Sequence, residues 1–223
     1  MECLRTLVQL EGPDNYNPKL VILIHGLAGH NWTFRDMKPA IADAGLQVNH
    51  WNYASTRGSL TDHVAAFHKM MNAMEGINEV QFVAHSLGGL LLRKALADEG
   101  QPWRRRIKVK QLIMIATPNQ GAVLAARFKD SEWFQYLFKG AGQDLTPGYT
   151  KTIPLPTMPY HLIAGQLEGE GNKKIPGPDD GVVAVSSVAI KSGDKPIIVK
   201  ANHMSIMVDE GVVDYVIKIL TMK

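Results

Sequence analysis

The chain has 223 residues, of which 45% are hydrophobic and 20% charged, and its formal net charge is +3 at pH 7. This composition is that of an ordinary soluble globular protein of one domain. The small net charge and the lack of any nucleic-acid-binding motif argue against a nucleic-acid partner. The single cysteine, Cys3, excludes an internal disulfide and a cysteine metal cluster.

The first residues of the chain contain no long apolar segment. Glu2 places an acid where a secretory leader has its basic region. No window approaches the roughly 18 uninterrupted apolar residues of a transmembrane helix. We therefore expect a cytoplasmic protein, and a secreted mature form whose leader has been removed is the alternative.

Continuous apolar runs alternate with helical patterns along the chain. This alternation predicts an α/β fold, in which a mostly parallel sheet is covered by helices on both faces. A weaker run at Leu4–Leu10 could add an edge strand. The six main strands are expected at Leu20–Ile24, Leu46–Trp51, Val80–Ala84, Gln111–Ala116, Tyr160–Ala164 and Pro196–Lys200.

Helical patterns fill several of the segments between these strands. A helix over Asp36–Ala44 contains Pro39, which should either open its main turn or kink it. A second helix is expected to be capped by Thr61 and to end at Gly76. A third helix should close the chain. The apolar faces of the second and third helices are formed by Val64, Phe67, Met71 and Met74, and by Val213, Ile217 and Leu220.

The residues from Phe82 to Gly89 join a strand, a serine and a helix. Ser86 stands between the apolar run that ends at Ala84 and the helix-forming run Leu90–Leu96. A tight turn of this kind holds the serine hydroxyl at its apex. The residues two before and two after the serine must then be small, because they crowd each other and the following helix. Here they are Ala84 and Gly88, so the pattern indicates a nucleophilic serine.

A strand further upstream ends in His25-Gly26 and is followed by a flexible loop. Together with the Ala-His-Ser-x-Gly turn, this order resembles the α/β-hydrolase superfamily and, within it, the small serine lipases and esterases. The resemblance extends from about Leu20 to Leu220. It implies the α/β-hydrolase fold in a single domain, residues 1–223, with a small lid inserted over residues 119–159.

The resemblance also implies an oxyanion hole. In this family one backbone N–H follows the nucleophile and another comes from the first loop, which corresponds here to Leu87 and Leu27. His25 would support that loop by hydrogen bonding. His85, beside the serine, is not expected to act as the base, since residues adjacent to the serine point elsewhere.

The family places an acid and then a histidine after the serine. The stretch Asp180-Gly-Val-Val is similar to the acid loop of many lipases, and Asp179 is a rival because the two carboxylates are adjacent. His203 is the only histidine just past the last expected strand. A histidine can take the serine proton and an aspartate can orient the histidine. The expected catalytic residues are therefore Ser86, Asp180 and His203.

The segment 119–159 interrupts the alternation of strands and helices and is rich in aromatic residues. Two interpretations stay open: a helix that packs its aromatic side chains on the core, and a small cap that forms the acyl pocket and contacts lipid. The second interpretation makes Phe128, Trp133 and Phe134 substrate-binding residues.

These features predict a serine carboxylester hydrolase, an esterase or lipase of lipid metabolism that cleaves acyl or otherwise apolar esters through an acyl-enzyme. The expected partners are a small-molecule ester or lipid substrate and, transiently, a lipid interface. No cofactor and no metal are expected. The alternatives are an acyltransferase, a hydrolase that remodels lipid anchors, and a catalytically silent binding protein. Acyl chain length, head group and oligomeric state stay open.

Overall fold

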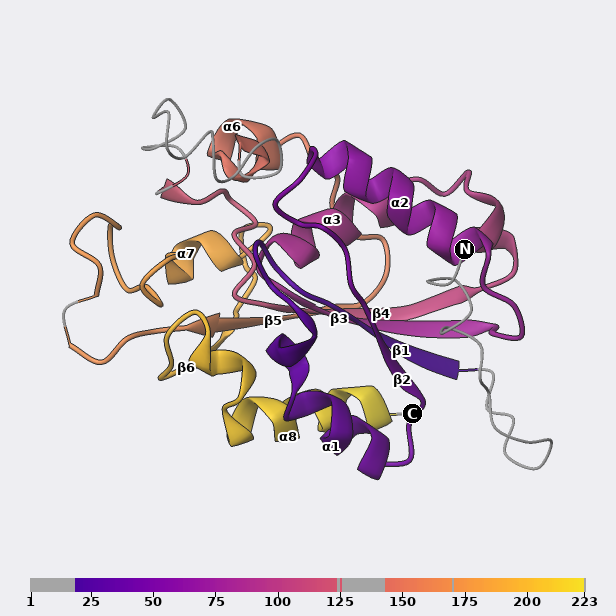
Figure 1. Ribbon diagram of the computed structural model, residues 1–223. Coiled ribbons are helices and arrows are strands. Elements are labelled where there is room, and N and C mark those ends of the chain that lie inside the picture. Colours follow the sequence, from indigo (N-terminus) through magenta and orange to yellow (C-terminus); the bar gives the residue numbers. More distant parts are fainter. Residues whose placement is uncertain (1–18, 124, 126–142, 170, 223) are drawn as a thin grey trace.

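The computed structural model describes residues 19–123, 125, 143–169 and 171–222. Their centre is a six-stranded sheet in the order β2-β1-β3-β4-β5-β6, in which every neighbouring pair is parallel (Figure 1). All six main strands expected from the sequence are confirmed; the weaker run at Leu4–Leu10 lies outside the described residues. The strands are β1 (Lys19–Ile24), β2 (Val48–Trp51), β3 (Glu79–His85), β4 (Lys108–Ile115), β5 (Tyr160–Gly165) and β6 (Ile197–Val199).

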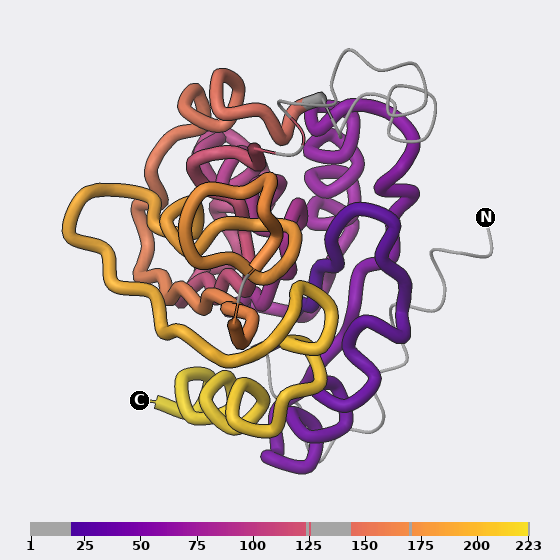
Figure 2. Tube along the Cα trace, turned by 90° about the vertical axis from the view of Figure 1, so that its left-hand side faces the viewer, coloured from indigo at the N-terminus to yellow at the C-terminus, as the bar shows by residue number. Residues whose placement is uncertain are grey.

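Helices cover both faces of the sheet, as the sequence predicts (Figures 1 and 2). The helices α2 (Leu60–Asn72) and α3 (Leu87–Leu96) lie on one face, and α1 (Met37–Asp43) and α8 (Glu210–Thr221) lie side by side on the other. Successive side chains of a strand point to opposite faces of the sheet and so enter two different hydrophobic cores. Ile22 and Ile24 of β1 pack with α2 and α3, whereas Val21 and Leu23 pack with α1 and α8.

The remaining elements are short. They are η2 (Asn31–Phe34), η3 (Pro102–Arg105), η4 (Gln143–Leu145), α6 (Pro147–Thr150), α7 (Val185–Val188) and η5 (Ser205–Met207). In the described ranges no helix has the length and apolar content that crossing a bilayer requires.

The expected limits of the second helix, Thr61 and Gly76, are wrong. Ser59 caps α2, because its hydroxyl accepts a hydrogen bond from the Asp62 N–H at 3.2 Å while the Asp62 carboxylate accepts from the Ser59 N–H at 2.7 Å. The helix ends at Asn72. In α1, Pro39 lies in the first turn, where its missing N–H leaves no helical hydrogen bond unmade.

The strand order brings the ends of β1 and β3 together. After β1 the chain moves outward to β2 and then returns to β3 on the other side of β1, so the direction of winding reverses between β1 and β3. Sites in open parallel sheets form at such a reversal, beyond the carboxyl ends of the strands. Ser86 follows β3 and Gly26 follows β1, so both lie at this point.

Three glycines let the segments at this point approach closely. A Cβ atom at Gly88 would lie 2.6 Å from the Ile24 carbonyl oxygen and 2.7 Å from that of His25. One at Gly26 would lie 2.8 Å from the Ser86 Cβ, and one at Gly89 would overlap the Thr117 side chain. The helix after Ser86 is therefore pressed against the end of β1.

We predict that Gly88→Ala lowers the free energy of unfolding by about 2–4 kcal/mol, because the added methyl group meets backbone carbonyls that cannot rotate away. Urea unfolding followed by circular dichroism measures the change. Gly148→Ala is the matched control, since a Cβ there meets no heavy atom within 4 Å. Equal stability of the two variants would contradict this account of the packing.

Candidate active site

Ser86 occupies the sharp turn between β3 and α3. Its backbone has φ 52° and ψ −123°, a conformation that is strained for a residue with a side chain. The turn is held by hydrogen bonds from the Ser86 N–H to the Ile115 carbonyl, at 2.9 Å, and from the Gly89 N–H to the Ser86 carbonyl, at 3.0 Å. The serine is 7% exposed, so the turn lies almost entirely in the interior.

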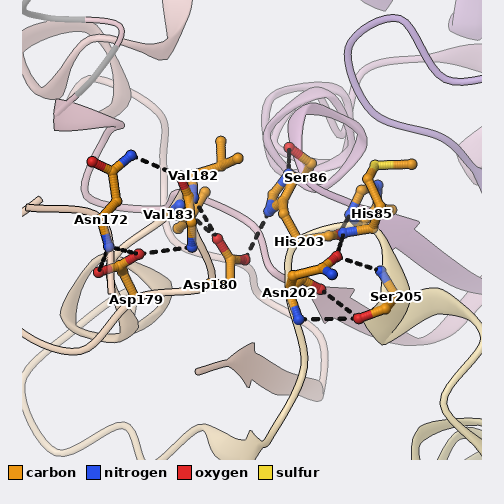
Figure 3. Close-up of polar contacts among 12 residues, drawn as sticks. His85, Ser86, Asn172, Asp179, Asp180, Val182, Val183, Asn202, His203 and Ser205 are labelled. Carbon is orange, nitrogen blue, oxygen red and sulfur yellow. Dashed lines mark hydrogen bonds and ion pairs between the residues drawn. The ribbon is translucent and has the colours of Figure 1, made fainter. Parts of the chain in front are cut away.

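The side chains of Ser86, His203 and Asp180 form one chain of hydrogen bonds (Figure 3). The His203 Nε2 atom lies 3.1 Å from the Ser86 Oγ, and the His203 Nδ1 atom lies 2.7 Å from Asp180 Oδ2. An ionised carboxylate can only accept, so Nδ1 carries the proton. Nε2 is then free to accept the proton of the serine hydroxyl.

The two adjacent carboxylates point to different partners. Asp180 Oδ1 accepts from the N–H groups of Val182, at 3.0 Å, and Val183, at 2.7 Å, which leaves Oδ2 for His203. Asp179 instead accepts from the N–H of Gly181 at 2.7 Å and from that of Asn172. Asp179 therefore joins the backbone at Asn172 to that at Gly181. Of the two carboxylates, it is that of Asp180 that contacts His203.

The main chain of His203 is held on both sides. Its N–H donates to the Asp180 carbonyl at 2.9 Å, and its carbonyl lies 2.9 Å from the Nε2 atom of His85. Burial lowers the pKa of His85 to about 3, so this ring is neutral and its Nε2–H donates. Sequence reasoning missed this contact, because it joins residues on two different strand ends.

The loop after β1 is held by a second histidine. The His25 Nδ1 atom lies 2.8 Å from the Gly26 carbonyl oxygen, and its Nε2 accepts from the Tyr53 N–H at 3.3 Å. The Tyr53 ring stacks on His25 with centroids 4.5 Å apart, and its hydroxyl donates to the His25 carbonyl at 3.0 Å. Burial lowers the pKa of His25. The sequence carried no local signal for the part that Tyr53 plays here.

Two backbone N–H groups, one in the loop after β1 and one directly after Ser86, are free within the described part of the chain. Neither the N–H of Leu27 nor that of Leu87 donates to a protein acceptor there. Leu87 is the first residue of α3, where a helix leaves its N–H groups unpaired. Leu27 precedes Ala28, whose φ of 54° turns the loop sharply.

The expected substrate-binding residues Phe128, Trp133 and Phe134 lie outside the described residues. The two described parts of the segment 119–159 contact each other, and Arg93 of α3 contacts both of them. The Ala122 N–H donates to the Leu145 carbonyl at 2.8 Å, and the buried Arg93 of α3 donates to the carbonyls of Asn119 and Ile153. Over the ranges described, no group of three His, Cys, Asp or Glu side chains is placed to hold a metal ion.

Solved structures similar to this one include lipases and esterases. The mature lipase BlEst2 of Bacillus licheniformis is 19% identical, with a TM-score of 0.73 over 96% of this chain and 95% of that one. The phospholipase PlaB of Legionella pneumophila is 16% identical, with a TM-score of 0.69 over 92% of this chain and 60% of that one. A metagenomic carboxyl esterase is 17% identical, with a TM-score of 0.66 over 85% and 65%.

These identities are low, so the three likenesses establish the fold and nothing finer. No curated protein sequence matches the chain. Residues 19–147 match the sequence family described as the alpha/beta hydrolase fold, and this match covers more than half of the chain. The sheet order, the turn at Ser86 and this match agree, and the chain belongs to the alpha/beta hydrolase fold family.

Proposed function

We propose that the protein is a serine carboxylester hydrolase that works through an acyl-enzyme. The observation that carries the proposal is the continuous chain of hydrogen bonds from Ser86 Oγ through His203 to Asp180. Serine is a weak nucleophile until a neighbouring base removes its proton, and a base held by a carboxylate in one tautomer is suited to do so.

In the proposed reaction, His203 Nε2 takes the Ser86 proton as Oγ attacks the ester carbonyl carbon. Asp180 stabilises the imidazolium that forms. The tetrahedral intermediate collapses, the C–O bond to the alcohol breaks, and the alcohol leaves with the proton from His203. Water then attacks the acyl-enzyme by the same route and releases the acid and free Ser86.

The oxyanion of the intermediate would be stabilised by the N–H groups of Leu27 and Leu87. Both are free of protein acceptors in the described residues, and Leu87 directly follows the nucleophile. Preorganised donors of this kind typically contribute about 3 kcal/mol each to transition-state stabilisation. The contacts among His25, Tyr53 and Gly26 would hold the Leu27 loop in place for this task.

Apolar side chains on the loops of the site favour an acyl or otherwise apolar substrate. Met204, beside His203, is 42% exposed, and Val182, two residues after Asp180, is 41% exposed. Trp32, in η2 after the Leu27 loop, is 53% exposed. The similar structures are those of a lipase, a phospholipase and a carboxyl esterase, which supports the same substrate class.

The proposal is tested by hydrolysis of p-nitrophenyl esters from acetate to palmitate. We expect turnover by the wild type, and the chain length that is cleaved fastest distinguishes an esterase from a lipase. Ser86→Ala and His203→Ala should each lower kcat by roughly 10⁴- to 10⁶-fold, because the nucleophile or its base is lost. Folded wild-type protein that cleaves none of the esters, or a Ser86→Ala variant that keeps its activity, would refute the proposal.

The two adjacent acids should respond differently to the same change. Asp180→Asn should lower kcat by roughly 10³- to 10⁴-fold, since the amide favours the wrong tautomer of His203. Asp179→Asn should mainly lower the free energy of unfolding, by about 1–3 kcal/mol, because it weakens the hydrogen bonds to Gly181 and Asn172. Kinetics and urea unfolding of both variants check this, and a larger loss of kcat in Asp179→Asn would reverse the assignment.

A further inference from the structure

The loop that carries His203 receives little support from the sheet. It follows β6, a strand of three residues at the edge of the described sheet, where its one neighbouring strand is β5. Two side chains of β6, Ile197 and Ile198, are 38% and 55% exposed, so packing does not fix this strand firmly. The position of the His203 main chain is therefore set by contacts beyond the strand, which include hydrogen bonds and the packing of the buried Ala201, Ile206 and Met207.

Two of these contacts hold the His203 peptide groups directly. The N–H donates to the Asp180 carbonyl, and the carbonyl accepts from His85 Nε2, each at 2.9 Å. His85 ends β3, an interior strand of the sheet, and is 3% exposed. The ring centroids of His85 and His203 lie 4.8 Å apart, so the two rings also touch.

We propose that His85 is a positioning residue, which sets the distance between the His203 Nε2 and the Ser86 Oγ by hydrogen-bonding the His203 carbonyl. This inference rests on the proposed function. His85 and Ser86 are consecutive, so any movement of the strand end carries the nucleophile and the donor together. The His203 carbonyl is thus hydrogen-bonded to the residue next to Ser86, so the loop of His203 is fixed relative to the turn of Ser86.

We expect kcat to depend on how far the hydrogen-bond donor at position 85 extends from the backbone. In His85→Gln the amide nitrogen can stand where the imidazole Nε2 stood, whereas in His85→Asn it falls short, near the place of Nδ1. These variants are matched in polarity and differ in reach. His85→Met, similar in volume and without a donor, provides a second variant that lacks the hydrogen bond.

We expect His85→Gln to keep kcat within about threefold of the wild type, and the Asn and Met variants to lose about 10- to 100-fold, as for the loss of one buried hydrogen bond that acts in the transition state. KM for a p-nitrophenyl ester should change by less than about twofold, since the His85 side chain is almost entirely buried. The rate at which a fluorophosphonate probe labels Ser86 should follow the same order as kcat.

The outcomes separate this inference from the proposed function. Wild-type protein that labels no faster than Ser86→Ala contradicts the proposed function, and the role of His85 with it. If the wild type is labelled rapidly and His85→Asn and His85→Met are labelled as fast, the role of His85 alone is overturned. The same holds if these two variants lose labelling only as much as His85→Gln does. Urea unfolding of each variant confirms that the proteins compared are folded, and a loss confined to KM also overturns the inference.

Discussion

The site depends on one close approach, that of the turn at Ser86 to the end of β1. Ser86 has a positive φ, which costs free energy that the surroundings must offset. Gly88 approaches backbone carbonyls at the end of β1, and Gly26 approaches the serine Cβ. A side chain at either glycine would not fit. The same contact places Gly26, which begins the first loop, against the Ser86 side chain.

The other half of the site is assembled from the loops after β5 and β6, which hydrogen bonds join to each other. Asp180 holds His203 twice, through its carboxylate and through its carbonyl. Two N–H groups hold the Asp180 carboxylate in turn, and Asp179 fixes the loop that bears it. The arrangement suits a base that must be held in one tautomer.

The sequence predicted the sheet well because strands buried on both faces read as unbroken apolar runs. It also pointed to Ser86, Asp180 and His203, which the structure brings into contact. It did not separate Asp179 from Asp180, because backbone turns decide which way each carboxylate points. Ser59 and Asp62 have the spacing of a helix cap, so the sequence did contain a local pattern for Ser59, although Thr61 was predicted. The contacts of His85 and Tyr53 join distant segments and leave no local pattern.

The proposed reaction depends on the activation of Ser86 as a nucleophile by His203. Its most direct test is peptide mapping after brief exposure to a fluorophosphonate probe, with His203→Ala treated in parallel. We expect one adduct per molecule, on the peptide that contains Ser86, and almost none in the variant. An adduct on another residue, equal labelling of the variant, or an unlabelled wild type that is folded would contradict it.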